Sequence, residues 1–259
     1  RPVERSRLGA WYPVAYLFLG VLVLLSVAVP LASVGRWLVS GGIAAWSDRY
    51  LLTALGQTIG YGLVGAVVTC LLAFPIAFLA VRFPGRVARV LESINYVTSS
   101  LPGLVTALAF VTVAIRLVQP LYQSAVLVIV VYLLMFLPRA IVNLRSGLAQ
   151  VPTGFEEAAR SLGRPPLLAF ITVTLRFVMP SALAGAALVF LGIVTELTST
   201  LLLAPNGTRT LAIQFWSRVN DIDYVGAAPY ASVMILLSLP VTYLLFARSR
   251  SEATAVNSL

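Results

Sequence analysis

The chain has 259 residues, of which 59% are apolar and 10% are charged, and its mean hydropathy is +0.95. A soluble domain carries about 25% charged residues, so this composition excludes a soluble protein and predicts an all-α integral membrane protein. The net charge of +9 rests on arginine as the sole basic residue type, and the arginines lie in loops between apolar segments rather than on one basic face. We therefore expect membrane lipid, and no nucleic acid, as a partner.

Side chains that carry out chemistry are scarce in this sequence. Histidine is absent, and the one cysteine, Cys70, lies inside an apolar run, where a small buried residue is the simplest interpretation. The sequence contains neither a metal-ligand spacing nor a nucleophile–base pair. We therefore expect no metal site, no catalytic residue and no enzymatic activity in this chain.

Six apolar segments are interpreted as membrane-spanning helices. The first is taken as a span rather than a removed signal peptide, because it is long and lacks a clear small-residue cleavage site. We divide the chain into an N-terminal part with the first span and an outer loop (1–50), a core with the other five spans (51–248) and a tail (249–259). The segments cover about residues 13–35, 51–81, 94–115, 124–142, 181–204 and 226–247.

Small residues are frequent in the second segment. Gly56 and Gly60 are four residues apart, a spacing that allows two membrane helices to approach closely, and Gly62 and Gly65 extend this surface. Pro75 is expected to kink the helix near its inner end.

The third segment begins with a polar, helix-breaking run, Ser99-Ser100-Leu101-Pro102-Gly103. Irregular backbone at membrane depth is tolerated only where it is buried in protein or lines a cavity. Two interpretations stay open: an ordinary proline kink, and a place for Ser99, Ser100 and Pro102 on a translocation pathway.

A polar stretch from Pro152 to Pro166 separates the fourth and fifth segments. Thr153 and Glu156 have the spacing of a capping box, and Gly163 followed by two prolines predicts the end of a helix. This helix is too short and too polar to cross a bilayer. We expect it to lie in a loop that extends over about residues 152–176.

The predicted loop helix has one thin apolar face. Its apolar positions recur at i, i+3, i+4 and i+7, and they are Phe155, Ala158, Ala159 and Leu162. The charged positions lie elsewhere on the helix and are Glu156, Glu157 and Arg160. Such a small face suits insertion into a groove of another protein, and the alternatives are a helix at the lipid interface or a mere connector.

The distribution of arginine predicts the orientation of the chain, because cytoplasmic loops carry the excess of positive charge. Of the 18 arginines, 13 lie in the N-terminal segment, the 82–89 loop, the 139–176 loop and the tail, and 5 lie in the opposite loops. We therefore expect both termini and the 152–176 loop to be cytoplasmic.

Glu196 is the acidic residue that lies well inside an apolar segment. A carboxylate at that depth costs at least ~2.5 kcal/mol, so it should face a cavity, have a partner or be protonated. It is interpreted either as part of a translocation pathway or gate, or as a structural hydrogen bond between helices. The hydroxyl groups expected beside it belong to Thr195, Thr198, Ser199 and Thr200.

Glu157-Ala158-Ala159, three further residues and Gly163 resemble the EAA loop of ABC-importer permeases. The family pattern continues nine residues later with Ile-x-Leu-Pro, which Val173-Thr174-Leu175 fits, whereas Arg176 replaces the proline. The resemblance covers roughly residues 50–248. It implies a type I ABC-importer permease fold with six transmembrane helices and cytoplasmic coupling helices, in which residues 155–163 enter a cleft of a cytoplasmic ATPase.

Three further stretches are similar to ferric-iron importer permeases, which makes ferric iron the expected substrate. Sulfate, thiamine, polyamine and phosphonate importers share the scaffold and remain alternatives. In some ferric permeases two six-helix halves are fused, and a start at Arg1 fits a processed or trimmed chain or a second half. The stretches are Leu101-Pro102-Gly103, the run from Glu196 through Pro205 to Ala212, and the run from Tyr224 to Pro240.

The resemblance also implies partners in a bacterial cytoplasmic membrane. The chain has no lysine and so no standard phosphate-binding G-x-x-x-x-G-K-[ST] loop, which leaves ATP and Mg²⁺ to two cytoplasmic ABC ATPase subunits. A second permease subunit or half and an extracytoplasmic solute-binding protein would complete the importer. The competing classes are an ATP-independent secondary transporter or channel, and a membrane scaffold without transport.

Overall fold

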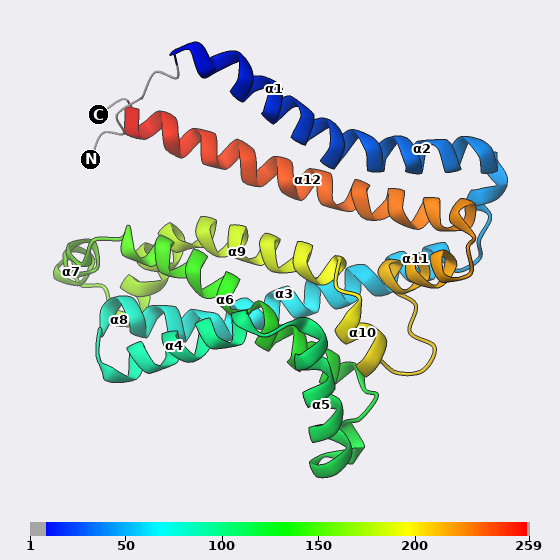
Figure 1. Ribbon diagram of the computed structural model, residues 1–259. Helices are drawn as coiled ribbons and strands as arrows, with labels where there is room; N and C mark the ends of the chain where they lie inside the picture. Colours follow the sequence, from blue (N-terminus) through cyan, green and yellow to red (C-terminus); the bar gives the residue numbers. More distant parts are fainter. Residues whose placement is uncertain (1–8, 258–259) are drawn as a thin grey trace.

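Figure 1 shows the protein as a computed structural model, in which residues 9–257 are described. Every regular element in that stretch is helical, which confirms the all-α prediction. The structure describes the backbone alone at 10, 92, 95, 96, 98, 99, 153, 244 and 247–257.

The helices follow one another in chain order. The first arm contains η1 (Gly9–Trp11), α1 (Tyr12–Val23), the π-helical η2 (Leu24–Ala28), α2 (Val29–Gly41) and η3 (Gly42–Trp46). The central part contains α3 (Leu51–Arg82), α4 (Arg86–Ser100), α5 (Gly103–Leu117), η4 (Gln119–Leu121) and α6 (Ala125–Ala149). The remainder contains α7 (Thr153–Ser161), α8 (Pro166–Ala169), the π-helical η5 (Phe170–Leu175), α9 (Arg176–Val194), α10 (Thr198–Leu203), α11 (Leu211–Asn220) and α12 (Tyr224–Asn257).

Five helical stretches among the described residues are long and apolar enough to cross a membrane. They match five of the six predicted segments, although several are longer than expected. The sixth apolar helix, α5, has 15 residues and is shorter than a full span. The five stretches are Tyr12–Trp46, Leu51–Arg82, Ala125–Ala149, Pro166–Val194 and Tyr224–Tyr243.

The predicted third segment is divided into two helices. α4 ends at Ser100 and α5 begins at Gly103, so the expected break at Pro102 is confirmed. Pro102 has ψ 139° and lacks an amide hydrogen, so it stands before the first turn of α5 rather than within a helix. α4 runs back beside α3 and α6, and α5 then turns away from them (Figure 1).

The predicted fifth segment is displaced along the chain. A continuous helical stretch begins at Pro166 and ends at Val194, so residues 166–176, which were predicted as loop, belong to the span. Arg176, which stands where the family has proline, donates its backbone N–H to the Val173 carbonyl. A proline could not make that hydrogen bond, so arginine allows the helix to continue without interruption.

The core is a bundle of α3, α6 and α9, whose close approach depends on small residues. An added Cβ on Gly62 would lie 2.7 Å from Phe190, and one on Gly65 would lie 2.5 Å from Ile193. An added Cβ on Gly56 or Gly60 meets nothing within 4 Å in the described chain, so these two glycines do not form the contacts of α3 inside the bundle. The buried face of α3 lies on other residues, Ala54, Thr58, Gly62, Gly65, Ala66, Thr69, Ala73 and Ala77.

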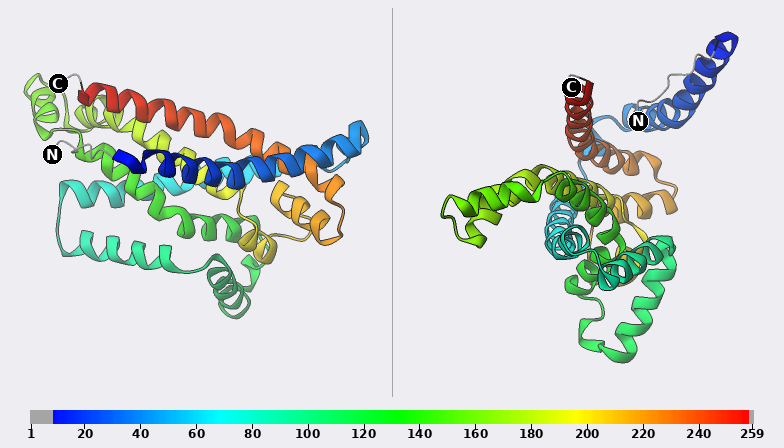
Figure 2. Two further views of the ribbon diagram at one scale, coloured as in Figure 1. Left: turned by 45° about the horizontal axis from the view of Figure 1, so that its top comes forward. Right: turned by 90° about the vertical axis from the view of Figure 1, so that its left-hand side faces the viewer.

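α1, α2 and α12 form a separate layer beside this bundle (Figures 1 and 2). α2 packs on α12, and the rings of Trp37 and Tyr224 stack with their centroids 5.1 Å apart. α1 leans away, and no residue in its 12 positions is buried. Such an apolar, uncovered surface is expected of a helix that faces lipid or another membrane chain.

The elements that carry the predicted site residues lie at opposite ends of the bundle. α7 and α8 lie at the end where α1 starts and α12 finishes, whereas α5, α10 and α11 lie at the other end (Figures 1 and 2). The long helices α3, α6 and α9 connect the two ends. The structure therefore places the two groups of predicted site residues at opposite ends of the molecule.

Candidate functional site

The C-terminal end of α7 is defined by the local sequence, as predicted. Gly163 has φ +86° and donates its N–H to the Arg160 carbonyl at 2.9 Å, while Arg164 donates to the Ala159 carbonyl at 3.2 Å. These two bonds form a Schellman motif, which needs the left-handed conformation that glycine adopts readily. The prediction that Gly163 ends this helix is confirmed.

The N-terminal end of α7 differs from the prediction. Thr153 is the first helical residue and Pro152 is the N-cap, with ψ 137°. A capping box needs the threonine at the N-cap itself, so the predicted pair of Thr153 and Glu156 is displaced by one residue and is wrong.

The predicted apolar face of α7 is divided between the protein interior and the surface. Ala159 is buried, whereas Ala158 is exposed and Leu162 is 86% exposed. Phe155 is half exposed, and its ring stacks on that of Phe177 with the centroids 6.0 Å apart. The exposed surface at α7 therefore includes Ala158 and Leu162, with the exposed charged residues Glu157 and Arg160 beside them.

Glu156 turns toward the protein rather than outward. Its Oε1 atom accepts a hydrogen bond from Arg82 Nη2 at 2.9 Å and another from the Thr174 hydroxyl. The side chains of Arg82 and Glu156 are 11% and 27% exposed, and Thr174 is fully buried. Glu156 therefore joins the first turn of α7 to the last residue of α3 and to η5.

At the opposite end, Glu196 lies in a break between two helices. α9 ends at Val194 and α10 begins at Thr198, so the expectation that Glu196 is inside a continuous span is wrong. Its Oε1 atom accepts the backbone N–H of Ser199 at 2.9 Å, which satisfies one of the free amides at the start of α10. Glu196 and Ser199 are separated by two residues, Leu-Thr, so this hydrogen bond is local. The Glu196 carboxylate therefore acts as a cap of α10 rather than as an unpaired buried charge.

The two broken stretches predicted as a pathway meet at α6. The Ser199 hydroxyl donates to Met135 Sδ at 3.1 Å, and a Cβ on Gly103 would lie 3.2 Å from Met135 Cε. Thr200 is fully buried and shares a hydrogen bond with the Tyr132 hydroxyl. Ser199, Thr200 and the residues after Pro102 are thus brought together, although the chain separates them by about a hundred residues.

The other predicted pathway residues are more dispersed. Thr195 is exposed, and it lines an apolar pocket of about 380 Å³ with residues of α11 and α12, including Phe215 and Met234. Ser100 is exposed at the end of α4, and the side chain of Ser99 lies outside the described residues. Within the described part of the chain, no three His, Cys, Asp or Glu side chains come together as a metal site.

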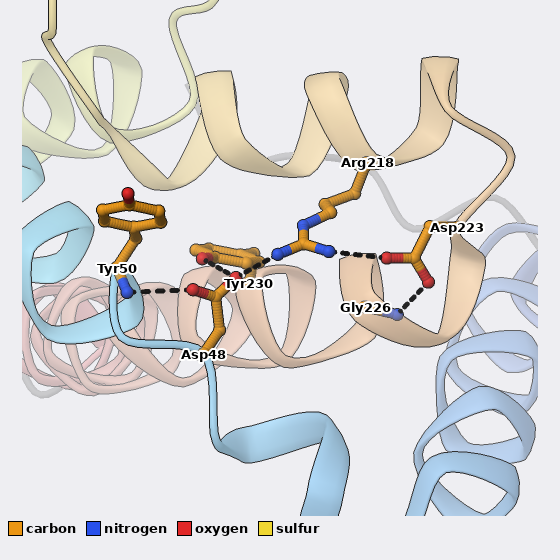
Figure 3. Close-up of polar contacts among 6 residues, drawn as sticks. All are labelled: Asp48, Tyr50, Arg218, Asp223, Gly226 and Tyr230. Atoms are coloured by element: carbon orange, nitrogen blue, oxygen red, sulfur yellow. Dashed lines mark hydrogen bonds and ion pairs between the residues drawn. The ribbon is translucent and has the colours of Figure 1, made fainter.

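Sequence reasoning missed a polar network at the end where α11 lies (Figure 3). Asp48 accepts hydrogen bonds from the Tyr50 N–H, the Tyr230 hydroxyl and Arg218, and its side chain is 12% exposed. Burial alone would raise the pKa of Asp48, but these hydrogen bonds and the Arg218 charge outweigh it and lower the pKa. Arg218 and Tyr230 lie 170 and 182 residues from Asp48 along the chain, so no local pattern could have indicated these two partners.

The same guanidinium holds a second carboxylate. Arg218 Nη1 donates to Asp223 Oδ2 at 2.8 Å, and Asp223 Oδ1 accepts the Gly226 N–H at 2.8 Å (Figure 3). The Gly226 N–H and then Arg218 lower the pKa of Asp223, although burial opposes them. The hydrogen bonds from Arg218 to Asp223 and to Asp48 raise the pKa of Arg218. The network joins the 47–50 loop to α11 and α12 beside a pocket of about 680 Å³.

Sequence reasoning also placed Arg139 at the inner end of a span, and the structure corrects this. α6 continues to Ala149, so Arg139 lies within the span, with its guanidinium 4.9 Å from the centre of the Phe136 ring. A Cβ on Gly192 would lie 2.5 Å from Arg139 Nη1, so the glycine makes room for this arginine. Ionisable residues at such depth are expected to face a protein interior or a cavity.

The chain has the type I ABC-importer permease fold. It superposes on the inward-facing methionine transporter MetNI with a TM-score of 0.62 and 17% identity, over 78% of this chain and 95% of that chain. It superposes equally on a bacterial alginate ABC transporter solved with its alginate-bound periplasmic protein, with a TM-score of 0.61 and 14% identity, over 94% of this chain and 95% of that chain.

The sequence comparison adds the family. Residues 71–250 match the family model described as binding-protein-dependent transport system inner membrane component, and the chain belongs to this family. It is thus a multi-pass membrane permease component and not an enzyme.

Individual relatives differ in the solute that their names state. The chain is 35% identical over 227 residues to the Fe(3+)-transport permease protein FbpB 2 of Haemophilus influenzae, over 86% of this chain and 45% of the relative. It is 25% identical to a probable sulfate permease protein of Nephroselmis olivacea, over 91% of this chain and 88% of that relative. It is 23% identical to a molybdate/tungstate permease protein of Thermococcus kodakarensis, over 89% of this chain and 94% of that relative. The chain spans less than half the length of the Haemophilus ferric relative.

Proposed function

We propose that this chain is one permease subunit or half of an ATP-driven importer, which moves a small solute into the cytoplasm by alternating access. Two cytoplasmic ATPase subunits would bind ATP and Mg²⁺, and a second permease subunit or half would complete the membrane part. An extracytoplasmic binding protein would deliver the solute to the end that carries α5, α10 and α11. Both termini and α7 would then be cytoplasmic.

In this mechanism each conformational step is a rigid-body movement. Closure of the ATPase subunits would displace α7, and the bundle of α3, α6 and α9 would rock against the second permease half. The broken segments around Met135 would form part of the pathway or its gate, because Ser199, Thr200 and the start of α5 converge there.

The observation that carries the proposal is the surface of α7. This short helix lies at one end of the molecule (Figure 1) and exposes Ala158 and Leu162 between charged side chains. An apolar side chain that is 86% exposed at a helix end is a suitable anchor for a pocket in a protein partner. The family match supports the same conclusion.

The direct test replaces Leu162 by arginine in the chain co-expressed with its ATPase partner. An unpaired charge in an apolar cleft costs several kcal/mol, and each 1.4 kcal/mol corresponds to a factor of about ten in affinity. We therefore expect at least a tenfold loss of co-purified ATPase for Leu162→Arg. The matched control is Ile222→Arg, a residue 74% exposed at the opposite end, which should retain the ATPase. Equal retention in both variants would contradict the docking role, and gradient-driven uptake without an ATPase would favour a secondary transporter or channel.

We propose ferric iron as the transported solute, on the similarity to the Haemophilus permease protein. The second candidate is an oxyanion such as sulfate or molybdate, favoured by relatives that match most of their own length. Metal and anion analysis decides between the two candidates. The sample is the binding protein that co-purifies with the wild-type complex in the same preparation. Bound iron would support the first candidate and bound oxyanion the second.

A further inference from the structure

Beside the stacking of Phe155 on Phe177, two polar contacts between α7 and the bundle converge on one carboxylate oxygen. Arg82 Nη2 and the Thr174 hydroxyl both donate to Glu156 Oε1, the former at 2.9 Å. These three residues belong to α3, η5 and α7, which are separate elements. A charge-assisted bond of this kind is shorter and stronger than a neutral one, and its low exposure limits screening by solvent.

The surroundings of Glu156 differ from those of the other charged residues of α7. Glu157 and Arg160 are exposed, whereas Glu156 points between helices and its partner Thr174 is fully buried. α7 otherwise packs mainly on α8 and η5. Arg82 is therefore the residue that attaches α7 directly to the long helix α3.

α3 carries this attachment to the far end of the molecule. The helix has 32 residues and so spans roughly 48 Å. Near its other end, Gln57 Oε1 accepts the Arg209 N–H at 2.6 Å and Thr58 Oγ1 accepts the Leu211 N–H at 2.8 Å. These bonds fix the loop that leads into α11. Polar contacts at its two ends and the one continuous helix α3 thus connect α7 with the end where α11 lies.

We propose that Glu156 is a positioning residue that, through Arg82 and Thr174, makes α7 move as one body with α3 and η5. The inference rests on the proposed function, in which α7 docks on the ATPase. Glu156 then does not bind the ATPase itself; Ala158 and Leu162 do. Displacement of α7 is transmitted along α3 to the loop before α11, and loss of the Glu156 contact separates docking from transport.

The test measures docking, relative movement and transport on the same full-length complex. Variants Arg82→Ala and Glu156→Ala remove the contact, and the double variant Arg82→Glu with Glu156→Arg restores an ion pair in reverse. Arg86→Ala, at an exposed arginine on the neighbouring α4, is the matched control. Spin labels at Gly154→Cys on α7, where an added side chain meets open space, and at the exposed Leu72→Cys on α3 report the distance, in a Cys70→Ser background.

We expect both single variants to co-purify with the ATPase as the wild type does. Their label distance distribution should broaden at least twofold, and uptake of Fe(III) delivered by its binding protein should fall at least tenfold per ATP hydrolysed. The reversed pair should narrow the distribution again and recover uptake, which a general loss of stability would not do. The Arg86→Ala control should keep the wild-type values.

Two results would overturn the proposal. One is an unchanged distance distribution with unchanged uptake in both single variants. The other is loss of the ATPase from these variants to the extent seen for Leu162→Arg, which would assign Glu156 to docking. If the wild type itself fails to bind an ATPase, the proposed function fails, while the label distances in the isolated chain still decide whether Glu156 holds α7 to α3.

Discussion

Arg218 illustrates how one residue can organise the end of the molecule at which α11 lies. It binds Asp48 from the loop before α3 and Asp223 from the turn before α12, and the Tyr230 hydroxyl donates to Asp48 as well. Removal of one partner would leave the other charged groups without their hydrogen bonds, which costs more than the intact pair contributes. The network therefore links three segments that are far apart in the sequence.

The network predicts how stability changes with pH. Asp48 and Asp223 have folded-state pKa values below those of the unfolded chain, so their contribution is complete above the unfolded value of about 4 and is lost as the pH falls through the lower folded values. The thermal midpoint of the purified protein in detergent should thus fall on acidification below about pH 4. Asp48→Asn should cost about 1–3 kcal/mol at pH 7 and should show a smaller further loss in acid.

The control for this prediction is Asp221→Asn, at an exposed aspartate of the same turn. It should keep the wild-type stability at pH 7 and the wild-type acid profile. An Asp48→Asn protein with the same midpoint as the wild type at both pH values would contradict a stabilising role for the network.

At the scale of single residues, the sequence predicted the features that depend on neighbouring residues in the chain. The stop at Gly163 follows from a local backbone conformation, and it was correct. The arginine partners of Glu156 and Asp48 were not predictable, because Arg82 and Arg218 lie 74 and 170 residues away from them. Glu196 was placed inside a helix because its flanking residues are apolar, whereas its own carboxylate caps the next helix.

At the scale of elements, the packing of α6 on α9 depends on Gly147. A Cβ there would lie 2.5 Å from the Ser181 Cβ, which is too short for a real contact and cannot be relieved by rotating a side chain. We expect Gly147→Ala to lower the free energy of unfolding by about 1–3 kcal/mol, because the two helices must move apart. Denaturation of the detergent-solubilised protein, followed by circular dichroism, measures the effect.

Gly60→Ala is the matched control within α3. An added Cβ at Gly60 meets nothing within 4 Å, and replacing a mid-helix glycine by alanine usually stabilises by about 0.5–1 kcal/mol. The two substitutions should therefore have opposite signs. A stabilising Gly147→Ala, or a strongly destabilising Gly60→Ala, would show that the α6–α9 contact is not arranged as described.

The apolar runs predicted that the helices exist, but they predicted less well at which residues each helix begins and ends. Pro166 was taken as a helix stop, yet proline is equally suited to a first helical turn, and the helix begins there. The choice of packing face was also beyond the sequence. Both Gly56/Gly60 and Gly62/Gly65 have spacings that suit close contact, and the position of α9 decides between them.

At the scale of the whole molecule, α7 and the two ends of the described chain lie at the same end of the molecule, opposite α11 (Figures 1 and 2). The arginine distribution and the proposed docking of α7 both assign this end to the cytoplasm. Which helices are neighbours could not be read from the sequence, since six apolar segments can be arranged in many ways. The pairing of α2 with α12, and of α5 with α10, required the structure.

The proposed orientation predicts the labelling of single cysteines in intact cells. In a Cys70→Ser background, Asn206→Cys, in the exposed turn before α11, should react with a membrane-impermeant maleimide. Arg160→Cys, exposed on α7, should react only after the membrane is opened, because the reagent cannot reach the cytoplasmic face. The Cys70→Ser protein without an added cysteine sets the background. Labelling of Arg160→Cys, and not of Asn206→Cys, in intact cells would reverse the orientation and remove α7 from the reach of any cytoplasmic ATPase.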